Sequence, residues 1–397
     1  MGGAHPTKMN TSEFNRERLR RWRMVLGGEQ DGTGCSLQGA DVAIDSALGD
    51  LYDNADKKRG SLEKSAPRVA RWLGDIRKFF PTPVVQMLQK DALERLDLKQ
   101  MLLQPELLQA VEPDVHLVAN ILALNSILPA KTRETARLVV RRVVDELQRK
   151  LANPTRQAIL GSLNRATRNR RPRHNEIDWH RTIRANLRHF QPDYNTIIPE
   201  TRIGYGRKRQ ALREVILCVD QSGSMASSVV YAGIFGAVLA SLPALTTRVV
   251  VFDTAVVDLT DELNDPVELL FGTQLGGGTD IRRALAYCQG LVRQPHDTIL
   301  VLISDLYEGG DEKAMLASLA HLVASGVQTI SLLALSDDGA PSFDHGNAGA
   351  MAAMGIPVFA CTPDLFPDMM AAAIGRQDLA QWAAASNIVV ARPATGT

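Results

Sequence analysis

The second half of the chain alternates short apolar runs with segments whose apolar residues have helical spacing. The apolar runs predict strands at 214–219, 248–252, 256–259, 298–303, 327–335 and 357–361. The intervening and following segments predict helices at 226–242, 281–292, 311–325, 346–354, 364–374 and 377–386. This alternation is typical of a mostly parallel sheet with helices on both faces. The run 256–259 follows its predecessor so closely that we expect a hairpin and an antiparallel edge strand.

The first half of the chain shows helical spacing only. Helices are expected at 13–26, 41–52, 61–80, 83–96, 105–111, 115–128 and 132–151. We therefore predict an all-α domain at 1–164, a basic linker with a connecting helix at 165–212, and an α/β domain at 213–397. The connecting helix spans 177–187, and we expect Ile177, Ile183 and Leu187 to face inward. Core positions are expected for the four tryptophans, Trp22, Trp72, Trp179 and Trp382.

Composition narrows the class of protein. The 397 residues carry a formal net charge of +1, so no overall field favours nucleic acid or a membrane. Residues 165–173 hold five arginines, yet no aromatic residues lie between them, so a solvated connector is expected and nucleic-acid binding is the alternative. The N-terminus lacks the apolar region of a secretion signal, and we expect no membrane-spanning stretch. Four widely spaced cysteines indicate reduced thiols and a cytoplasmic protein.

Oxygen-bearing side chains follow the predicted strands where a ligand site is expected. Asp220, Ser222 and Ser224 lie where the strand 214–219 gives way to a helix. Thr279 ends the glycine run 276–278, and Asp305 follows the strand 298–303. The carboxyl ends of parallel strands share one edge of a sheet, where open α/β sheets bind their ligands. Because carboxylates and hydroxyls are hard oxygen donors, the set predicts Mg²⁺ or Mn²⁺.

This five-residue set resembles the metal-ion-dependent adhesion site of von Willebrand factor A domains. The resemblance implies a Rossmann-like, doubly wound sheet and a metal held directly by the two serines and Thr279. In that family the aspartates act mostly through water, and an Asp or Glu of another protein fills the open coordination position. No general base is evident beside these turns, which favours binding over catalysis. The alternatives are a metal-dependent hydrolase in the same pocket, or serines that only cap a helix.

A second resemblance comes from the segment before the first strand. Asp178, the sequence Thr182-Ile183-Arg184-Ala185-Asn186-Leu187 and the basic run 207–209 look like the CoxE-like group of bacterial von Willebrand A proteins, as does the sequence 21–27. Members of that group work beside MoxR-type AAA+ ATPases. The resemblance therefore implies a protein-interaction module whose partner is such an ATPase or its client.

Other polar residues near the same edge have simpler expected roles. Asp280 and Asp311 are expected to cap helices, and Glu308 is assigned a structural role. The loop 336–349 should lie on the metal edge, either as the rim that a partner meets or as an ordinary surface loop. The glycines 276–278 lack the pattern of a phosphate-binding loop, so no nucleotide site is expected.

Overall fold

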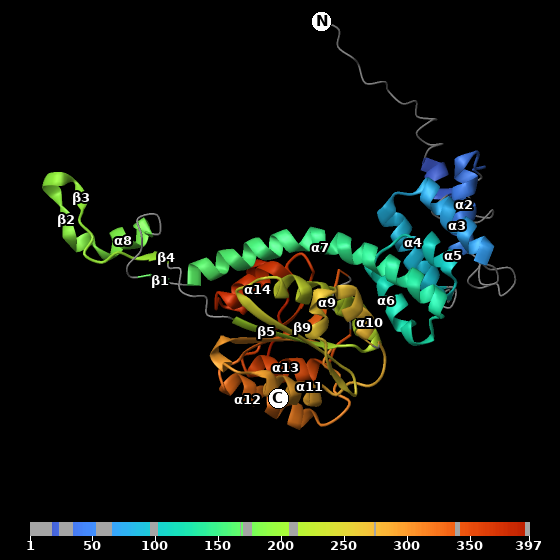
Figure 1. Ribbon diagram of the computed structural model, residues 1–397. Coiled ribbons are helices and arrows are strands. Elements are labelled where there is room, and N and C mark those ends of the chain that lie inside the picture. The colour runs from blue at the N-terminus through green and yellow to red at the C-terminus, as the bar shows by residue number, and fades with distance from the viewer. Residues whose placement is uncertain are drawn as a thin grey trace, which may run out of the picture. The chain divides into compact units, whose positions relative to one another are not determined.

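The computed structural model describes residues 18–23, 35–52, 66–95, 102–166, 168–169, 177–205, 213–273, 275–337 and 342–393. The chain forms two compact units, one of residues 1–121 and 127–140, the other of residues 122–126 and 141–397. The first unit is helical, and the second contains a six-stranded sheet (Figure 1). The predicted combination of an all-α region with an α/β fold is confirmed.

Helices build the N-terminal part of the chain. They are α2 (Ala40–Tyr52), α3 (Ala66–Phe79), α4 (Thr82–Arg95), α5 (Pro105–Ala110), α6 (Val115–Ala123), the 3₁₀ turn η3 (Asn125–Ile127) and α7 (Ala130–Ala166). Leu51, Ile76 and Leu108 are fully buried between them. Trp72 is also buried, and its indole N–H donates to the Ala47 carbonyl oxygen at 2.8 Å, which satisfies its one polar group.

Helix α7 is longer than predicted. The expectation of a helix ending near Leu151 was wrong, because α7 continues for 37 residues and contains Pro154. A proline inside a helix removes one backbone hydrogen bond. Leu151, Thr155 and Ile159 are buried on one side of this stretch, so packing compensates for the lost bond. The Thr155 hydroxyl also donates to the Leu151 carbonyl oxygen at 2.7 Å.

The connecting segment is a small module of short elements. It contains α8 (Trp179–Ala185), η5 (Leu187–His189), β2 (Phe190–Gln191), η6 (Pro192–Tyr194) and β3 (Thr196–Ile197). Nearby, β1 (Arg168–Asn169) pairs antiparallel with β4 (Gly204–Tyr205). Most of the predicted basic run 165–173 lies outside the described residues.

The predicted orientation of the connecting helix was wrong at two of three positions. Ile177 is buried, but Ile183 is 44% and Leu187 is 60% exposed. Thr182 and Asn186 occupy the inner face instead, because their side chains bond to the returning backbone. Two of the tryptophans expected in the core, Trp22 and Trp179, are about half exposed as well.

The sheet of the second unit has six strands in the order β10-β9-β8-β5-β6-β7. Their bounds are β5 (Arg213–Asp220), β6 (Leu245–Phe252), β7 (Val256–Asp258), β8 (Thr298–Ile303), β9 (Gln328–Leu335) and β10 (Val358–Cys361). Neighbouring strands are parallel except β7, which runs antiparallel to β6 at the edge. The predicted doubly wound sheet with one antiparallel edge strand is confirmed.

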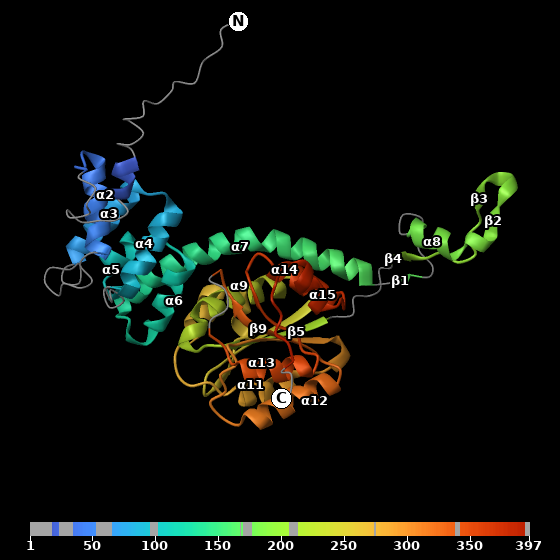
Figure 2. The ribbon, with the colours of Figure 1, turned by 180° about the vertical axis from the view of Figure 1, so that it is seen from behind.

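Helices cover both faces of this sheet (Figures 1 and 2). One face carries α11 (Ile281–Leu291), α12 (Glu312–Ala324) and α13 (His345–Ala353). The other carries α9 (Ala226–Ala240), α10 (Pro266–Gly272), α14 (Phe366–Ile374) and α15 (Leu379–Ala385). Alternate strand residues such as Cys218, Val250 and Leu302 belong to the core beneath the first group. Helix α10 was not predicted from the sequence, although its Asp265 cap followed by proline is a recognisable start signal.

Helix α9 is buried on nearly all sides. Gly223–Ala240, which contains it, is the one stretch of the described residues long and apolar enough to cross a membrane, where the sequence analysis expected none. It is 72% buried within the protein and serves here as a core helix. Two glycines allow its close approach. A Cβ on Gly236 would lie 2.7 Å from Val249 Cγ2, and one on Gly233 would lie 2.9 Å from Leu269 Cδ2.

We expect Gly236→Ala to destabilise the sheet unit by about 1–3 kcal/mol, because the added methyl group overpacks the contact between α9 and β6. Gly290→Ala is the matched control: it is also a helical glycine, but a Cβ there meets nothing within 4 Å. The control should be neutral or stabilise by up to about 1 kcal/mol. Urea unfolding of both variants measures the difference, and equal stabilities would contradict the close packing of α9.

Candidate metal centre

Asp220 is the last residue of β5, in the middle of the sheet, and its side chain is fully buried. Its Oδ1 accepts a hydrogen bond from the Ser222 backbone N–H at 2.8 Å. Its Oδ2 accepts one from the Ser304 hydroxyl, also at 2.8 Å. Since Ser304 follows the neighbouring strand β8, the second bond ties together the carboxyl ends of two parallel strands.

The two predicted serines connect to the second predicted aspartate. Ser222 Oγ lies 3.2 Å from Ser224 Oγ, and the Ser224 hydroxyl donates to Asp305 Oδ2 at 2.6 Å. Asp305 is buried, whereas Ser222 is half-buried and Ser224 is exposed. Four of the five predicted ligands therefore lie within one hydrogen-bonded group, with its hydroxyls toward solvent.

The backbone holds the fifth predicted residue, Thr279, against the same group. Its carbonyl oxygen accepts from the Gly309 N–H at 2.8 Å, four residues beyond Asp305. Upstream, the Gly276 N–H donates to the Gln221 carbonyl oxygen at 3.0 Å, next to Asp220. The half-buried Thr279 thus sits on a loop attached to both aspartate-bearing turns.

Glycine is required at two points of this loop region. Gly276 has a φ of +115°, which is open to glycine but strained for other residues. A Cβ on Gly309 would lie 2.8 Å from the Thr279 carbonyl oxygen, closer than real Cβ contacts allow. The turn after Asp305 can therefore reach Thr279 only because residue 309 has no side chain.

Charge makes this edge of the sheet favourable for a cation. Burial is the main cause that raises the pKa of Asp220 above its ordinary value, and the nearby negative charge of Asp305 raises it further. The hydrogen bonds from Ser222 and Ser304 oppose the shift. A divalent cation would favour the ionised form of Asp220. The donor set of carboxylates and hydroxyls fits Mg²⁺ or Mn²⁺.

Ser304, Leu306 and Glu308 support the site without having been predicted as ligands. Ser304 also accepts from the Leu306 N–H at 3.0 Å, so it braces the turn as well as Asp220. Glu308 accepts from the Ile281 N–H at 2.7 Å and thereby helps to cap α11. The sequence did carry a signal for Ser304, since it is a polar residue that ends an apolar strand just before Asp305.

The predicted capping roles at this edge are confirmed. Asp280 accepts from the Arg283 N–H at 2.8 Å, and Asp311 accepts from the Ala314 N–H at 3.0 Å. The described part of the loop 336–349 also meets the site, because the Asp344 N–H donates to the Asp305 carbonyl oxygen at 2.9 Å. The hydroxyl groups of Tyr307 and Ser342 form a hydrogen bond of 2.8 Å at the exposed surface.

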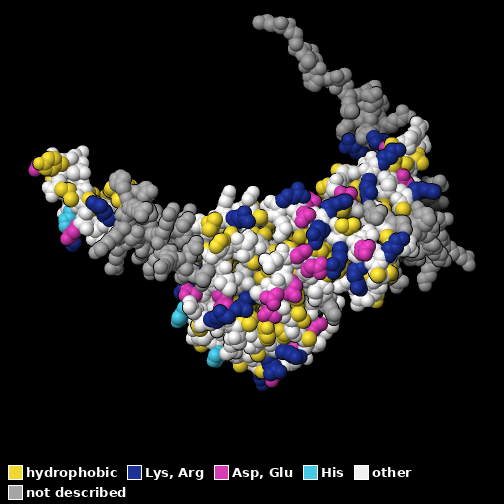
Figure 3. Space-filling model, viewed as in Figure 1, with side chains coloured by type: hydrophobic (Ala, Val, Ile, Leu, Met, Phe, Trp, Pro, Cys, Tyr) yellow, Lys and Arg dark blue, Asp and Glu magenta, His cyan; other side chains and the backbone are white. Residues whose placement is uncertain are grey.

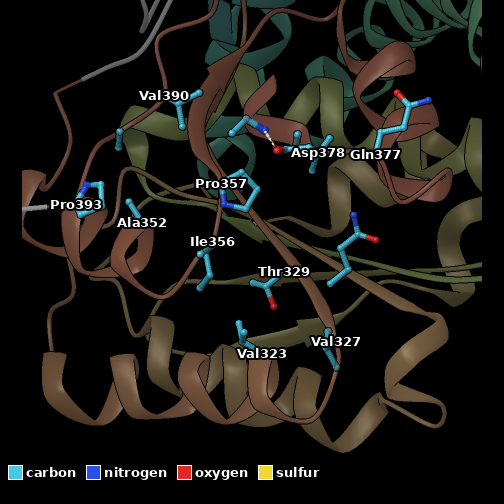
Figure 4. Close-up of a pocket in the computed structure, with 15 residues that line it drawn as sticks. Val323, Val327, Thr329, Ala352, Ile356, Pro357, Gln377, Asp378, Val390 and Pro393 are labelled. Carbon is cyan, nitrogen blue, oxygen red and sulfur yellow. Dashed lines mark hydrogen bonds between the residues drawn. The ribbon is translucent and has the colours of Figure 1, made fainter. Parts of the chain in front are cut away.

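The rest of the described structure offers no second candidate for a metal or catalytic site. Within the described residues, no three or more His, Cys, Asp or Glu side chains are grouped to hold a metal. A cation beside Asp220 and Asp305 would therefore depend on hydroxyl ligands as well. A pocket of about 450 Å³ lies at the amino ends of β9 and β10, opposite the metal edge (Figure 4). Its lining is largely aliphatic, and its carboxylate, Asp378, already accepts from two backbone N–H groups of α15. It offers no group free for acid–base chemistry.

Comparison with known proteins agrees with this architecture. Residues 147–370, more than half of the chain, match the family described as "VWA domain containing CoxE-like protein". The chain belongs to this CoxE-like VWA family. It is also 35% identical over 353 residues to "Uncharacterized protein YehP" of Escherichia coli K12, covering 87% of this chain and 93% of that relative.

Two solved structures are similar to part of this CoxE-like chain. They are an aerotolerance-related membrane protein from Bacteroides fragilis NCTC 9343 and the conserved hypothetical protein BatB from Bacteroides thetaiotaomicron. Each is 16% identical, and each match covers 43% of this chain and 99% of the other. The TM-scores are 0.33 and 0.34.

Asp220→Asn should stabilise the protein in EDTA but destabilise it, relative to wild type, in Mg²⁺. The folded state raises the pKa of Asp220, so wild type loses stability as pH rises from the ordinary Asp value through the folded pKa. The asparagine amide avoids this loss. The greater stability of the variant in EDTA should vanish below about pH 3.8, where the Asp220 carboxyl of wild type is protonated and neutral too. Thermal unfolding across pH with and without Mg²⁺ measures both effects. Equal Mg²⁺ stabilisation of both proteins would contradict the assigned role of Asp220.

Gly309→Ala should weaken Mn²⁺ binding by about 10–100-fold, the usual effect of disturbing groups that support metal ligands. The added Cβ pushes against the Thr279 carbonyl oxygen and displaces that residue. Gly223→Ala is the control, because it changes a glycine within the Asp220–Ser224 turn where a Cβ meets nothing within 4 Å. Mn²⁺ titration followed by electron paramagnetic resonance gives both affinities, and matching values would argue against a ligand role for Thr279.

Proposed function

We propose that this CoxE-like protein is a metal-dependent protein-interaction module. Asp220, Ser222, Ser224, Thr279 and Asp305 would hold Mg²⁺ or Mn²⁺ at the carboxyl edge of the sheet. When bound, the cation supplies an electrophilic position for a carboxylate of another protein. The hydrogen-bonded group from Asp220 to Asp305 carries the proposal, because it gathers oxygen donors from the turns after two strands at one exposed edge.

The surroundings of the site favour binding over hydrolysis. A hydrolase needs a free base within reach of the attacking water. The carboxylates beside the site are already engaged by backbone N–H groups: Glu308 accepts from three, and Asp280 and Asp344 each cap a helix. These bonds engage the three carboxylates in fixing the loops around the site.

The rim around the site offers a contact surface for the partner. Tyr307, two residues after Asp305, is 46% exposed and is oriented by its bond to Ser342. On the adjoining side, the Tyr231 hydroxyl donates to Asp337 at 2.7 Å, which anchors the start of the loop after β9. Tyr307 gives this rim apolar area with little loss of side-chain entropy, as tyrosines do in many protein interfaces.

The proposed partner is a MoxR-type AAA+ ATPase or a client of that ATPase. Membership of the CoxE-like family supports this choice, since the group resembled here works beside such ATPases. We place the complex in the cytoplasm, consistent with the free thiols of Cys218, Cys288 and Cys361 in the core. The partner would contribute an exposed Asp or Glu side chain.

The test is capture of a MoxR-type ATPase from the same genome by the purified full-length chain. Capture should occur in Mg²⁺, disappear in EDTA and return when Mg²⁺ is restored. Ser224→Ala should abolish capture because it removes a hydroxyl donor from the site. Ser325→Ala is the control and should leave capture unchanged, because it removes a hydroxyl at the C-terminal end of α12, outside both the rim and the proposed ligands.

Three results would contradict the proposed function. Capture that is unchanged in EDTA and with Ser224→Ala would separate partner binding from the metal. Mg²⁺-stimulated turnover of a phosphate or peptide substrate, lost in Asp305→Ala, would favour the hydrolase alternative. Salt-dependent binding of DNA or RNA without any protein partner would favour the basic segment 165–173 as the functional element.

A further inference from the structure

A rigid hairpin stands in the segment between α8 and β4. Strands β2 and β3 pair antiparallel, with Phe190 opposite Ile197 and Gln191 opposite Thr196. The four residues 192–195 form the tip. Pro192 fixes its own φ, and Asn195 adopts a left-handed conformation with a φ of 45° while its N–H donates to the Pro192 carbonyl oxygen at 3.2 Å. The tip is therefore a tight, well-defined turn.

Buried side chains hold the base of this hairpin. The Thr182 hydroxyl donates to the Ile203 carbonyl oxygen at 3.0 Å and accepts from the Ile203 N–H at 3.0 Å. Asn186 makes the equivalent pair of bonds to Thr201, at 2.8 and 3.1 Å. Both side chains are almost fully buried, and the two strand ends cannot separate without breaking all four bonds. The structure thus preorganises the hairpin, which lowers the entropy cost of binding through it.

Large hydrophobic residues are exposed on this module, among exposed arginines such as Arg184 and Arg188. Its exposed large hydrophobic residues are Trp179, Ile183, Leu187, Phe190, Tyr194 and Ile198. Figure 3 shows these yellow side chains on the segment that Figure 1 labels α8, β2 and β3, with acidic side chains in magenta at its end. Several exposed large hydrophobic residues on one small module are typical of an element that contacts another protein.

The tip presents one carboxylate that its own surroundings do not use. Asp193 is exposed, and its side chain makes no hydrogen bond or ion pair with the described residues. The other acidic residues of the module are engaged: Asp178 caps α8, and Glu200 pairs with Arg188 at 3.4 Å. Tyr194, beside Asp193, is 78% exposed. The hairpin therefore offers a carboxylate together with an aromatic ring.

The metal edge offers the complement of this tip. If the proposed function holds, on which this inference rests, the cation provides a position for one carboxylate. Tyr307, two residues from the proposed ligand Asp305, has an exposed ring, and its backbone N–H donates to Asp305 Oδ1 at 3.5 Å. The Asp193 carboxylate and Tyr194 of the tip would thus meet the cation and Tyr307 of the metal edge. Aromatic pairs of this kind stabilise an interface beyond the apolar area that they bury.

We propose that the chain binds a second copy of itself, with the Asp193 carboxylate of one copy on the metal of the next. The two surfaces are different, so the contact is head to tail, and repetition of it produces rings or open chains. The 192–195 tip is the inserting element, and the apolar surface of the module covers the rim around the metal. Release of the tip would free the metal for the carboxylate of another partner.

The experiment is sedimentation equilibrium of the full-length protein in Mg²⁺ and in EDTA. Wild type should associate with rising concentration in Mg²⁺ and keep the mass of one chain, 43.3 kDa, in EDTA. Asp193→Asn keeps the metal site but loses the carboxylate, and Ser224→Ala keeps the carboxylate but loses a ligand. Each variant alone should stay monomeric. Their equimolar mixture should form a 1:1 dimer in Mg²⁺ and nothing larger, because it restores a single complementary contact.

Controls separate this inference from the proposed function. Glu200→Gln changes another exposed carboxylate of the module and should associate like wild type. Thermal shift in Mg²⁺ should show that Asp193→Asn still binds the ion as wild type does. Wild type that binds Mg²⁺ but stays monomeric, or Asp193→Asn that associates normally, would overturn self-association and leave the metal-dependent module intact. Wild type that shows no response to Mg²⁺ would overturn both.

Discussion

Parallel pairing of β5 with β8 places two carboxylates at one edge of the sheet, and the rest of the site depends on that arrangement. Asp220 ends β5, and Asp305 follows β8 by two residues. Both side chains are buried, so their negative charges oppose each other in a medium less polar than water. The hydroxyls of Ser304 and Ser224 offset part of this cost. The proposed cation at the same place would offset more of it.

The backbone around the two carboxylates accepts a local cost in stability in order to place the loops of the site. Leu306 is fully buried and has a φ of +66°, a conformation that costs about 1–2 kcal/mol for a residue with a side chain. Asn347 stabilises it, because its amide donates to the Leu306 carbonyl oxygen at 3.1 Å. The turn then brings Gly309 against Thr279. Leu306, with its strained backbone, and Gly309, which has no side chain, both allow the loop after β8 to approach the loop that carries Thr279.

The sequence predicted the sheet well because its central strands are buried on both faces and are therefore continuous apolar runs. The polar residues at the ends of those runs predicted the hydrogen-bonded group of carboxylates and hydroxyls at the carboxyl edge. Supporting contacts were harder to predict, since the value of Ser304 or Gly309 depends on which distant backbone each one meets. Helix α7 continues past Pro154 because its residues on one side are buried, and local helix propensity carries no information about that packing.

The module around α8 shows a different limit of pattern analysis. Its apolar residues recur at Trp179, Ile183 and Leu187, four residues apart, which normally marks the buried stripe of a helix. Thr182 and Asn186 have the same spacing, and each can satisfy two backbone groups of the returning chain. Unpaired backbone groups are costly to bury, whereas apolar side chains can remain exposed at a smaller cost until a partner covers them. The polar stripe therefore takes the inside, and the apolar stripe stays available for contact with another protein.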